Sequence, residues 1–192
     1  MANNLEELEQ ERLKFEADYA QKKISREEYL ALHLAYTERY YELIAPPQPK
    51  ILGEISQAEA NTLLRETLPK PSPYDRDPFF FSDTSYQLTT ISDIKAFLEA
   101  AGINKLSYVV NFRDCDNFAA GLYGHLATEP GWENIAQALV WGNFPGLGPH
   151  AWNLVIACET ERRIYFIEPQ TNQVWEVAKE TFKGLVIWLV VM

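Results

Sequence analysis

The periodicity of the apolar residues changes near residue 136, and this change constrains the fold more than any other feature of the chain. Before it, apolar residues recur at helical intervals of three and four positions. After it come five short β-prone runs separated by turn-rich stretches: 136–141, 152–158, 164–167, 174–177 and 185–191. Helices followed by consecutive strands favour an α+β fold with an antiparallel sheet.

The first 45 residues are predicted to form a helical hairpin. An apolar stripe runs over residues 5–19, and a second stripe over residues 29–43 follows a capping-box pair, Ser25 and Glu28. Proline cannot continue a helix, so the proline-rich stretch after residue 45 predicts a linker. We therefore expect an acidic amphipathic arm (1–45), a linker (46–55) and an α+β domain (56–192).

Further signals place elements inside the α+β domain. The capping-box pair Ser56 and Glu59 predicts a helix to about Leu68, and Ser92 with Asp93 predicts one that ends at Gly102. The apolar run 106–112 indicates a buried strand. Four prolines and three consecutive phenylalanines in 69–83 predict a long ordered loop or a strap across the core.

Composition excludes several classes of function. The 192 residues carry 17 basic and 27 acidic side chains, a formal net charge of −10 that repels nucleic acid and anionic lipid. No apolar run is long enough to span a bilayer, and the closing run 185–192 is predicted to be a buried strand. With only two cysteines and a polar, acidic N-terminus, the expected location is cytoplasmic.

Cys115, His150 and Glu168 form the one trio whose local contexts suit a cysteine nucleophile. Cys115 lies where a β-rich run gives way to a helical pattern, and a helix N-terminus favours the thiolate. His150 opens one strand-like run and Glu168 closes the next, so antiparallel pairing brings a base near a group that orients it.

These residues resemble the papain-like cysteine peptidase superfamily, in particular its transglutaminase-like and NlpC-type cell-wall peptidase branches. The resemblance covers about residues 108–177 and rests on Asp-Cys-Asp-Asn-Phe-Ala around Cys115, His-Ala-Trp-Asn from His150 and Ile-Glu-Pro-Gln-Thr around Glu168. It implies a papain-like fold, in which a core helix that starts at the cysteine packs on an antiparallel sheet.

The resemblance also implies a thiol hydrolase or acyl transferase that acts on a peptide, isopeptide or amide bond, without metal or cofactor. Cys115 is then the nucleophile, His150 the base and Glu168 the orienting group, with Gln170 as its substitute. Asn111 and backbone N–H groups are expected to stabilise the oxyanion, with Asp116 in a supporting position. Trp152 and Asn153, which follow His150, are expected to contact the substrate.

Two alternatives remain open from the residues alone. Asp114 and Asp116 flank the thiol and oppose a thiolate, unless both carboxylates accept hydrogen bonds from backbone donors. A catalytically silent binding or assembly protein, which uses the hairpin for oligomerisation or docking, is therefore the second hypothesis. The other alternative is that Asp114, Asp116, His150 and Glu168 surround a divalent metal, although the close-spaced His or Cys pairs typical of zinc sites are absent from the sequence.

Overall fold

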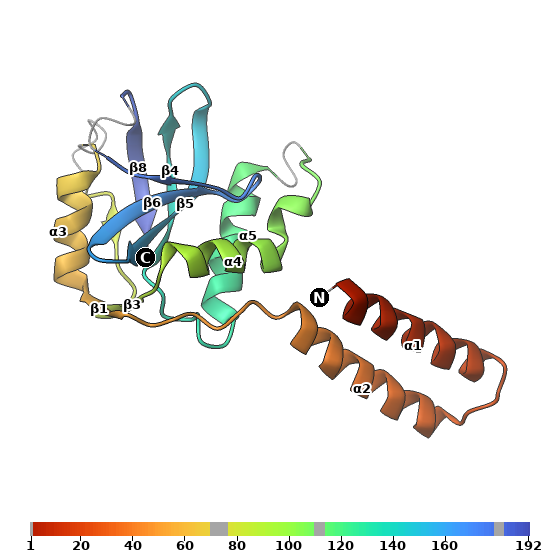
Figure 1. The fold of residues 1–192 in the computed structure, drawn as a ribbon. Coiled ribbons are helices and arrows are strands. Elements are labelled where there is room, and N and C mark those ends of the chain that lie inside the picture. Colours follow the sequence, from red (N-terminus) through yellow and green to blue (C-terminus); the bar gives the residue numbers. More distant parts are fainter. Residues whose placement is uncertain (1, 70–76, 110–113, 179–182) are drawn as a thin grey trace. The chain divides into compact units, whose positions relative to one another are not determined.

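The computed structural model describes residues 2–69, 77–109, 114–178 and 183–192. It divides into two compact units, Met1–Pro46 and Pro47–Met192 (Figure 1). The division of the second part into a separate linker (46–55) and a domain remains a prediction.

The first unit is a helical hairpin. Its helices are α1 (Ala2–Ala20) and α2 (Arg26–Ile44), which agree with the two predicted apolar stripes. The predicted capping box forms at the start of α2: Ser25 N–H donates to Glu28 over 2.8 Å, and Glu28 N–H donates to Ser25 Oγ over 3.2 Å. Phe15 is buried between the helices, edge-on to the rings of Tyr29 and Tyr36.

The second unit is built on a six-stranded sheet of order β2-β8-β4-β5-β6-β7. Its strands are β2 (Phe79–Phe80), β4 (Gln137–Phe144), β5 (Gly148–Cys158), β6 (Arg162–Glu168), β7 (Gln173–Glu176) and β8 (Val186–Val191). All five β-prone runs after residue 136 are therefore strands, because each alternates or is continuously apolar between turn signals.

The sheet is mixed, which corrects the expected antiparallel sheet. Phe79 and Phe80, from the segment predicted as a loop or strap, pair in parallel with Val190 and Val191 of β8. The other four strand pairs are antiparallel. A strand contributed from far along the chain can approach the open edge of β8 in either direction, and no local signal in the sequence decides which.

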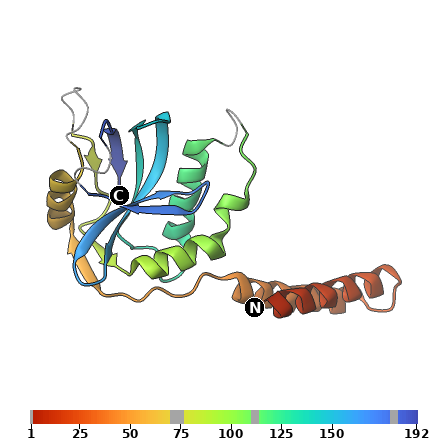
Figure 2. The ribbon, with the colours of Figure 1, turned by 45° about the horizontal axis from the view of Figure 1, so that its top comes forward.

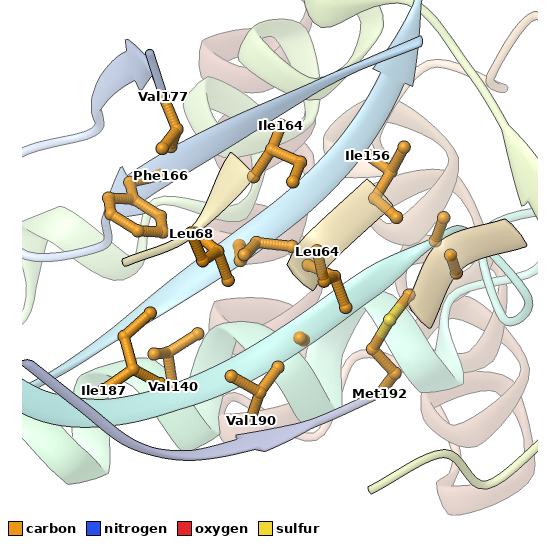
Figure 3. Packing of buried hydrophobic residues seen from close by; sticks show 14 of the residues in the cluster. Leu64, Leu68, Val140, Ile156, Ile164, Phe166, Val177, Ile187, Val190 and Met192 are labelled. Carbon is orange, nitrogen blue, oxygen red and sulfur yellow. The ribbon is translucent and has the colours of Figure 1, made fainter. Parts of the chain in front are cut away.

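Helices cover both faces of this sheet (Figures 1 and 2). On one face α3 (Gln57–Thr67) presents Ala60 and Leu64 to the alternate residues of β5 and β6 that point toward it, as Figure 3 shows for Leu64, Ile156, Ile164 and Phe166. On the other face lie α4 (Ile91–Ala101) and α5 (Cys115–Thr128), whose buried residues meet Ala151, Val155 and Ile167. Burial on both faces explains why β5 is an almost continuous apolar run.

Short elements complete the second unit. Strands β1 (Gly53–Ser56) and β3 (Ser85–Leu88) form a separate antiparallel pair, and a single 3-10 turn, η1 (Ile103–Lys105), follows α4. The capping box of α3 forms as predicted, and Gly102 ends α4 in the left-handed conformation. The predicted start of α4 shifts, because Thr90 rather than Ser92 or Asp93 is its N-cap.

Two predictions were wrong, one for the segment 106–112 and one for the connection between β4 and β5. Residues 106–109 form no strand, and Leu106, Tyr108 and Val109 are exposed; the rest of the predicted strand 106–112 lies outside the described residues. The turn-rich stretch between the predicted runs 136–141 and 152–158 is shorter than expected, since β4 continues to Phe144 and β5 begins at Gly148. Among the residues that the structure describes, no helix is both long enough and apolar enough to cross a membrane.

Gly142 permits close contact between β4 and β8. A Cβ at this position would lie 2.2 Å from the backbone oxygen of Val186 and 2.9 Å from the Trp152 ring, beside an irregularity in the β4–β8 register. Gly142→Ala should therefore force the strands apart and lower the free energy of unfolding by about 1–3 kcal/mol or more. The matched control is Gly124→Ala in α5, where an added Cβ meets nothing within 4 Å. That change should stabilise by about 0.5–1 kcal/mol. Denaturant unfolding of both variants measures the difference, and equal effects would contradict this role of Gly142.

An exposed polar cluster joins the start of α3 to β6 and should make stability depend on pH. The Arg162 guanidinium donates to Glu59 over 2.8 Å, and this bond, with those from Ser56, lowers the pKa of Glu59 to about 2. Because the pKa is lower in the folded protein than in the unfolded chain, the stabilisation is present above about pH 4.5 and is lost as the pH falls toward 2.

The expected result is a Glu59→Gln variant that is less stable than the parent at pH 7 and equal to it near pH 2. Thermal unfolding across this range measures the gap, which should shrink in high salt because the pair is exposed. A gap that does not change with pH would show that the charge of Glu59 contributes nothing.

Candidate functional site

One cavity of the second unit contains all three residues of the predicted trio. It has a volume of about 600 Å³ and is open to solvent. Its lining residues are Tyr108, Cys115, Phe144, Leu147, Pro149, His150, Glu168, Gln170, Thr171, Gln173 and Trp175. The fold therefore brings Cys115, His150 and Glu168 to one cavity, although the chain separates the first from the last by about fifty residues.

Helix α5 determines where the thiol lies. Cys115 is the first residue of α5 and is partly exposed. One turn later Ala119 is fully buried against the sheet, and its backbone oxygen accepts a 2.9 Å hydrogen bond from the Asn153 carboxamide of β5. This bond fixes the first turn of α5 to the strand that carries His150, so the helix N-terminus and the imidazole belong to one rigid arrangement.

His150 and Glu168 form a directly bonded pair. His150 Nε2 lies 2.6 Å from Glu168 Oε2, and the two side chains are only 10% and 11% exposed. The pairing follows from the antiparallel register, in which Asn153 of β5 faces Ile167 of β6. With the carboxylate ionised, Nε2–H is the donor, and Nδ1 is then the proton acceptor of the ring.

Aromatic neighbours fix the plane of the imidazole. The ring of Trp152 stacks on His150 at 6.2 Å between centroids, and the ring of Phe144 meets it edge-on at 6.1 Å. The second carboxylate oxygen of Glu168 accepts the backbone N–H of Gln170 over 3.2 Å. The imidazole and the carboxylate are thus each held on two sides, which limits the rotamers that they can adopt.

The aspartates beside the thiol take part in the start of α5. The carboxylate of Asp116 is exposed and accepts the backbone N–H of Asn117 over 2.9 Å. Asp114 is the N-cap residue, and its N–H donates to the Asn117 side chain over 3.3 Å. The aspartates were expected to oppose a thiolate unless their carboxylates accept hydrogen bonds from backbone donors. Asp116 meets this condition, because its carboxylate oxygen accepts a hydrogen bond from a backbone N–H group.

The remaining predicted site residues fall into three groups. Gln170 lines the cavity, and its role as a substitute for Glu168 remains a prediction. Trp152 and Asn153 do not line it, because both are buried, at 0% and 1% exposure, on the opposite faces of β5. Their expected role in contacting a substrate is corrected to packing and to holding α5. Asn111 lies outside the described residues.

Sequence reasoning missed most of the cavity wall. The rings of Tyr108, Phe144 and Trp175 and the polar side chains of Thr171 and Gln173 line the cavity, but none lies in a recognisable motif. The β-prone run 174–177 placed Trp175 on the strand after Glu168. Among the described residues there is no group of three or more His, Cys, Asp or Glu side chains arranged to hold a metal ion.

Comparisons with known proteins identify the fold through solved structures. No protein family matches the sequence, and no curated protein matches it either. One similar structure is a complex of PSL1a with E64, with a TM-score of 0.54 and 23% identity over 72% of this chain. Another is the Polyporus squamosus lectin bound to the epitope Neu5Acα2-6Galβ1-4GlcNAc, with a TM-score of 0.56 and 20% identity over 72% of this chain.

This likeness shows a shared fold. The chain spans about half the length of each of these proteins, 51% and 49%. At this coverage and identity, the architecture of the shared half can be transferred from those proteins to this chain, but the activity of the whole protein cannot.

The comparisons overturn the family assigned from the sequence. One similar structure is a lectin bound to a glycan and the other is a complex with E64, and on this likeness the papain-like fold, with its transglutaminase-like and cell-wall peptidase branches, is corrected to the fold shared with these structures. The thiol hydrolase or acyl transferase function and the peptide or amide substrate, which were implied only by that family, are corrected with it. The physical reason is that three short motifs specify a helix start and two strand ends, and such local features do not identify a family.

Loss of the Glu168 carboxylate should destabilise the fold around the cavity. In Glu168→Ala the largely buried imidazole of His150 loses its partner, which should lower the free energy of unfolding by about 1–3 kcal/mol. The control is Glu176→Ala on the next strand, whose pair with Arg163 is 44% exposed on both sides and should contribute at most about 1 kcal/mol. Chemical denaturation compares the two variants, and a larger loss for Glu176→Ala would refute the structural importance of the His150–Glu168 pair.

Proposed function

We propose that this protein is a binding protein whose ligand is a saccharide held in the cavity beside Cys115. The composition of the cavity wall carries the proposal. The rings of Tyr108, Phe144 and Trp175 offer flat apolar surfaces for the C–H faces of a sugar ring. Gln170, Thr171 and Gln173 supply both donors and acceptors, as a chain of hydroxyl groups requires.

The fold comparison supports binding as the kind of function. One of the similar structures is a lectin in complex with a sialylated trisaccharide, and this chain shares its fold over about half of that protein. In the present chain, however, the Glu168 carboxylate lies in the cavity and the formal net charge is −10. Both disfavour an anionic ligand, so we propose a neutral saccharide rather than a sialylated one.

Within this proposal Cys115, His150 and Glu168 are the functional centre of the cavity. The His150–Glu168 pair presents an oriented imidazole to the ligand, and the thiol of Cys115 forms part of the same wall. A bulky group on the thiol should therefore exclude the ligand. This consequence distinguishes the cavity from any other surface on which a saccharide binds.

Calorimetric titration with Galβ1-4GlcNAc and with Neu5Acα2-6Galβ1-4GlcNAc tests the proposal. We expect the neutral disaccharide to bind more tightly than the sialylated trisaccharide. Trp175→Ala should weaken binding at least about tenfold, because it removes a ring from the cavity wall. The matched control is Trp188→Ala on β8, which removes a tryptophan that is 45% exposed and does not line the cavity. Equal losses in the two variants, or no binding of either saccharide, would refute the proposal.

Chemical modification locates the ligand independently. Iodoacetamide alkylates accessible thiolates. Protein alkylated at Cys115 should no longer bind the saccharide, while a Cys115→Ser variant should retain binding and resist the block. Cys158, outside the cavity, provides the internal control for modification. Unchanged saccharide binding by fully modified Cys115 would place the ligand elsewhere.

A further inference from the structure

The β6–β7 hairpin carries much of the polar wall of the cavity, although it lies at an edge of the sheet. Strand β7 is the last in the sheet order and pairs there with β6. Glu168 and Gln173 are the final pair of this hairpin, and the loop 169–172 joins them. Both residues line the cavity, as do Gln170 and Thr171 of the loop. A loop at a sheet edge opens locally unless a further contact holds it, so the attachment of this loop decides how rigid the wall is.

The backbone of the loop reverses direction in two steps. The Thr171 N–H donates to the backbone oxygen of Glu168 over 3.2 Å, which closes a turn with Pro169 at its second position. Asn172 then has a φ of +56°, in the left-handed region that glycine adopts most readily and asparagine tolerates. Among the described residues, Lys22 is the one other non-glycine residue with a positive φ. Glycine would make this turn without strain, so the turn itself does not require the side chain of Asn172.

The side chain of Asn172 does not line the cavity and bonds instead to helix α4. Its Nδ2 donates to the backbone oxygen of Leu98 over 3.1 Å. The same oxygen accepts the N–H of Gly102 over 3.2 Å, at the C-terminal end of α4. Leu98 is buried in a core cluster with Val155 and Ile167 of the central sheet. The loop is therefore attached to a point that the core already fixes.

The other end of the carboxamide indicates that this bond is the reason for the side chain. Asn172 Oδ1 is buried and has no hydrogen-bond partner among the described residues. Burial of an unpaired carbonyl oxygen lowers stability, and glycine at this position would avoid that loss. The bond to Leu98 is thus the favourable contact that asparagine adds to the turn.

We infer that Asn172 is a positioning residue, which anchors the loop 169–172 to α4 and so holds this wall of the cavity in place for the ligand. The effect extends to the imidazole. The N–H of Gln170, in the same loop, donates to Glu168 Oε1, and Glu168 Oε2 lies 2.6 Å from His150 Nε2. The contribution to ligand affinity rests on the proposed function, whereas the anchoring of the loop does not.

Two variants of the full chain remove the anchor and keep the backbone conformation. Asn172→Gly retains the left-handed φ without a side chain, and Asn172→Asp retains the shape of the side chain but cannot donate at pH 7. The matched control is Lys22→Gly in the turn of the first unit, where the φ is also +56°. It introduces the same flexibility into the unfolded chain and leaves the cavity unchanged.

Hydrogen exchange of the free protein, followed by NMR, measures the anchoring. Both Asn172 variants should accelerate exchange of the Gln170 and Thr171 amides about two- to tenfold, as expected for the loss of one hydrogen bond. The amides of β5, which pairs on both sides, are the internal reference and should not change. Unchanged exchange of the loop amides in both variants, or equal acceleration in the loop and in β5, would overturn the inference.

Calorimetric titration of the same proteins with Galβ1-4GlcNAc measures the consequence for binding. Asn172→Gly and Asn172→Asp should each weaken binding about two- to tenfold, and Lys22→Gly should bind like the parent. Full affinity in a variant whose loop exchanges faster would overturn the positioning role. If the parent itself binds no saccharide, the proposed function fails, and the exchange comparison alone decides whether Asn172 anchors the loop.

Discussion

The structure depends on the burial of the central strands β4 and β5 on both faces of the sheet. Residues of β5 alternate between the core beneath α3 and the core beneath α4 and α5, so neither set of helices is dispensable. The glycine at position 142 lets β4 approach β8 closely at one end of this sheet, and the buried Trp152 ring fills the space beside it. Since β5 also carries His150, the packing that holds the sheet together also sets the position of the imidazole.

The positions of the candidate site residues follow from this layered packing. One face of the sheet receives α5, whose first residue is Cys115, and the β5–β6 register brings Glu168 to His150. The Asn153–Ala119 bond links the two parts. The cavity therefore combines a fixed polar pair with aromatic and carboxamide side chains from β4, β7 and the segments around them. Such a wall suits recognition of a ligand that has both apolar faces and hydroxyl groups, which is why we propose binding of a saccharide.

Some of these elements could be predicted from the sequence and others could not. The capping boxes of Ser25 and Ser56 and the glycine at 102 gave correct helix ends, because each depends on hydrogen bonds or backbone conformation within a few residues. The run 106–112 looked like a buried strand, yet its described part is exposed, since an apolar run alone does not specify what covers it. The papain-like assignment failed for a related reason: a cysteine at a helix start and a histidine on a strand describe local positions that different families share.

By itself the sequence determined the two hairpin helices, the five strands after residue 136, and the placement of Cys115, His150 and Glu168 at or near the ends of their elements. These features follow from periodicity and capping, which act over one or two turns of chain. Only the tertiary structure decided that Phe79 and Phe80 join β8 in parallel, that Trp152 and Asn153 are buried, and that Tyr108 and Trp175 line the cavity. Those outcomes depend on contacts between residues far apart in the chain. Local sequence patterns do not specify the energies of such contacts.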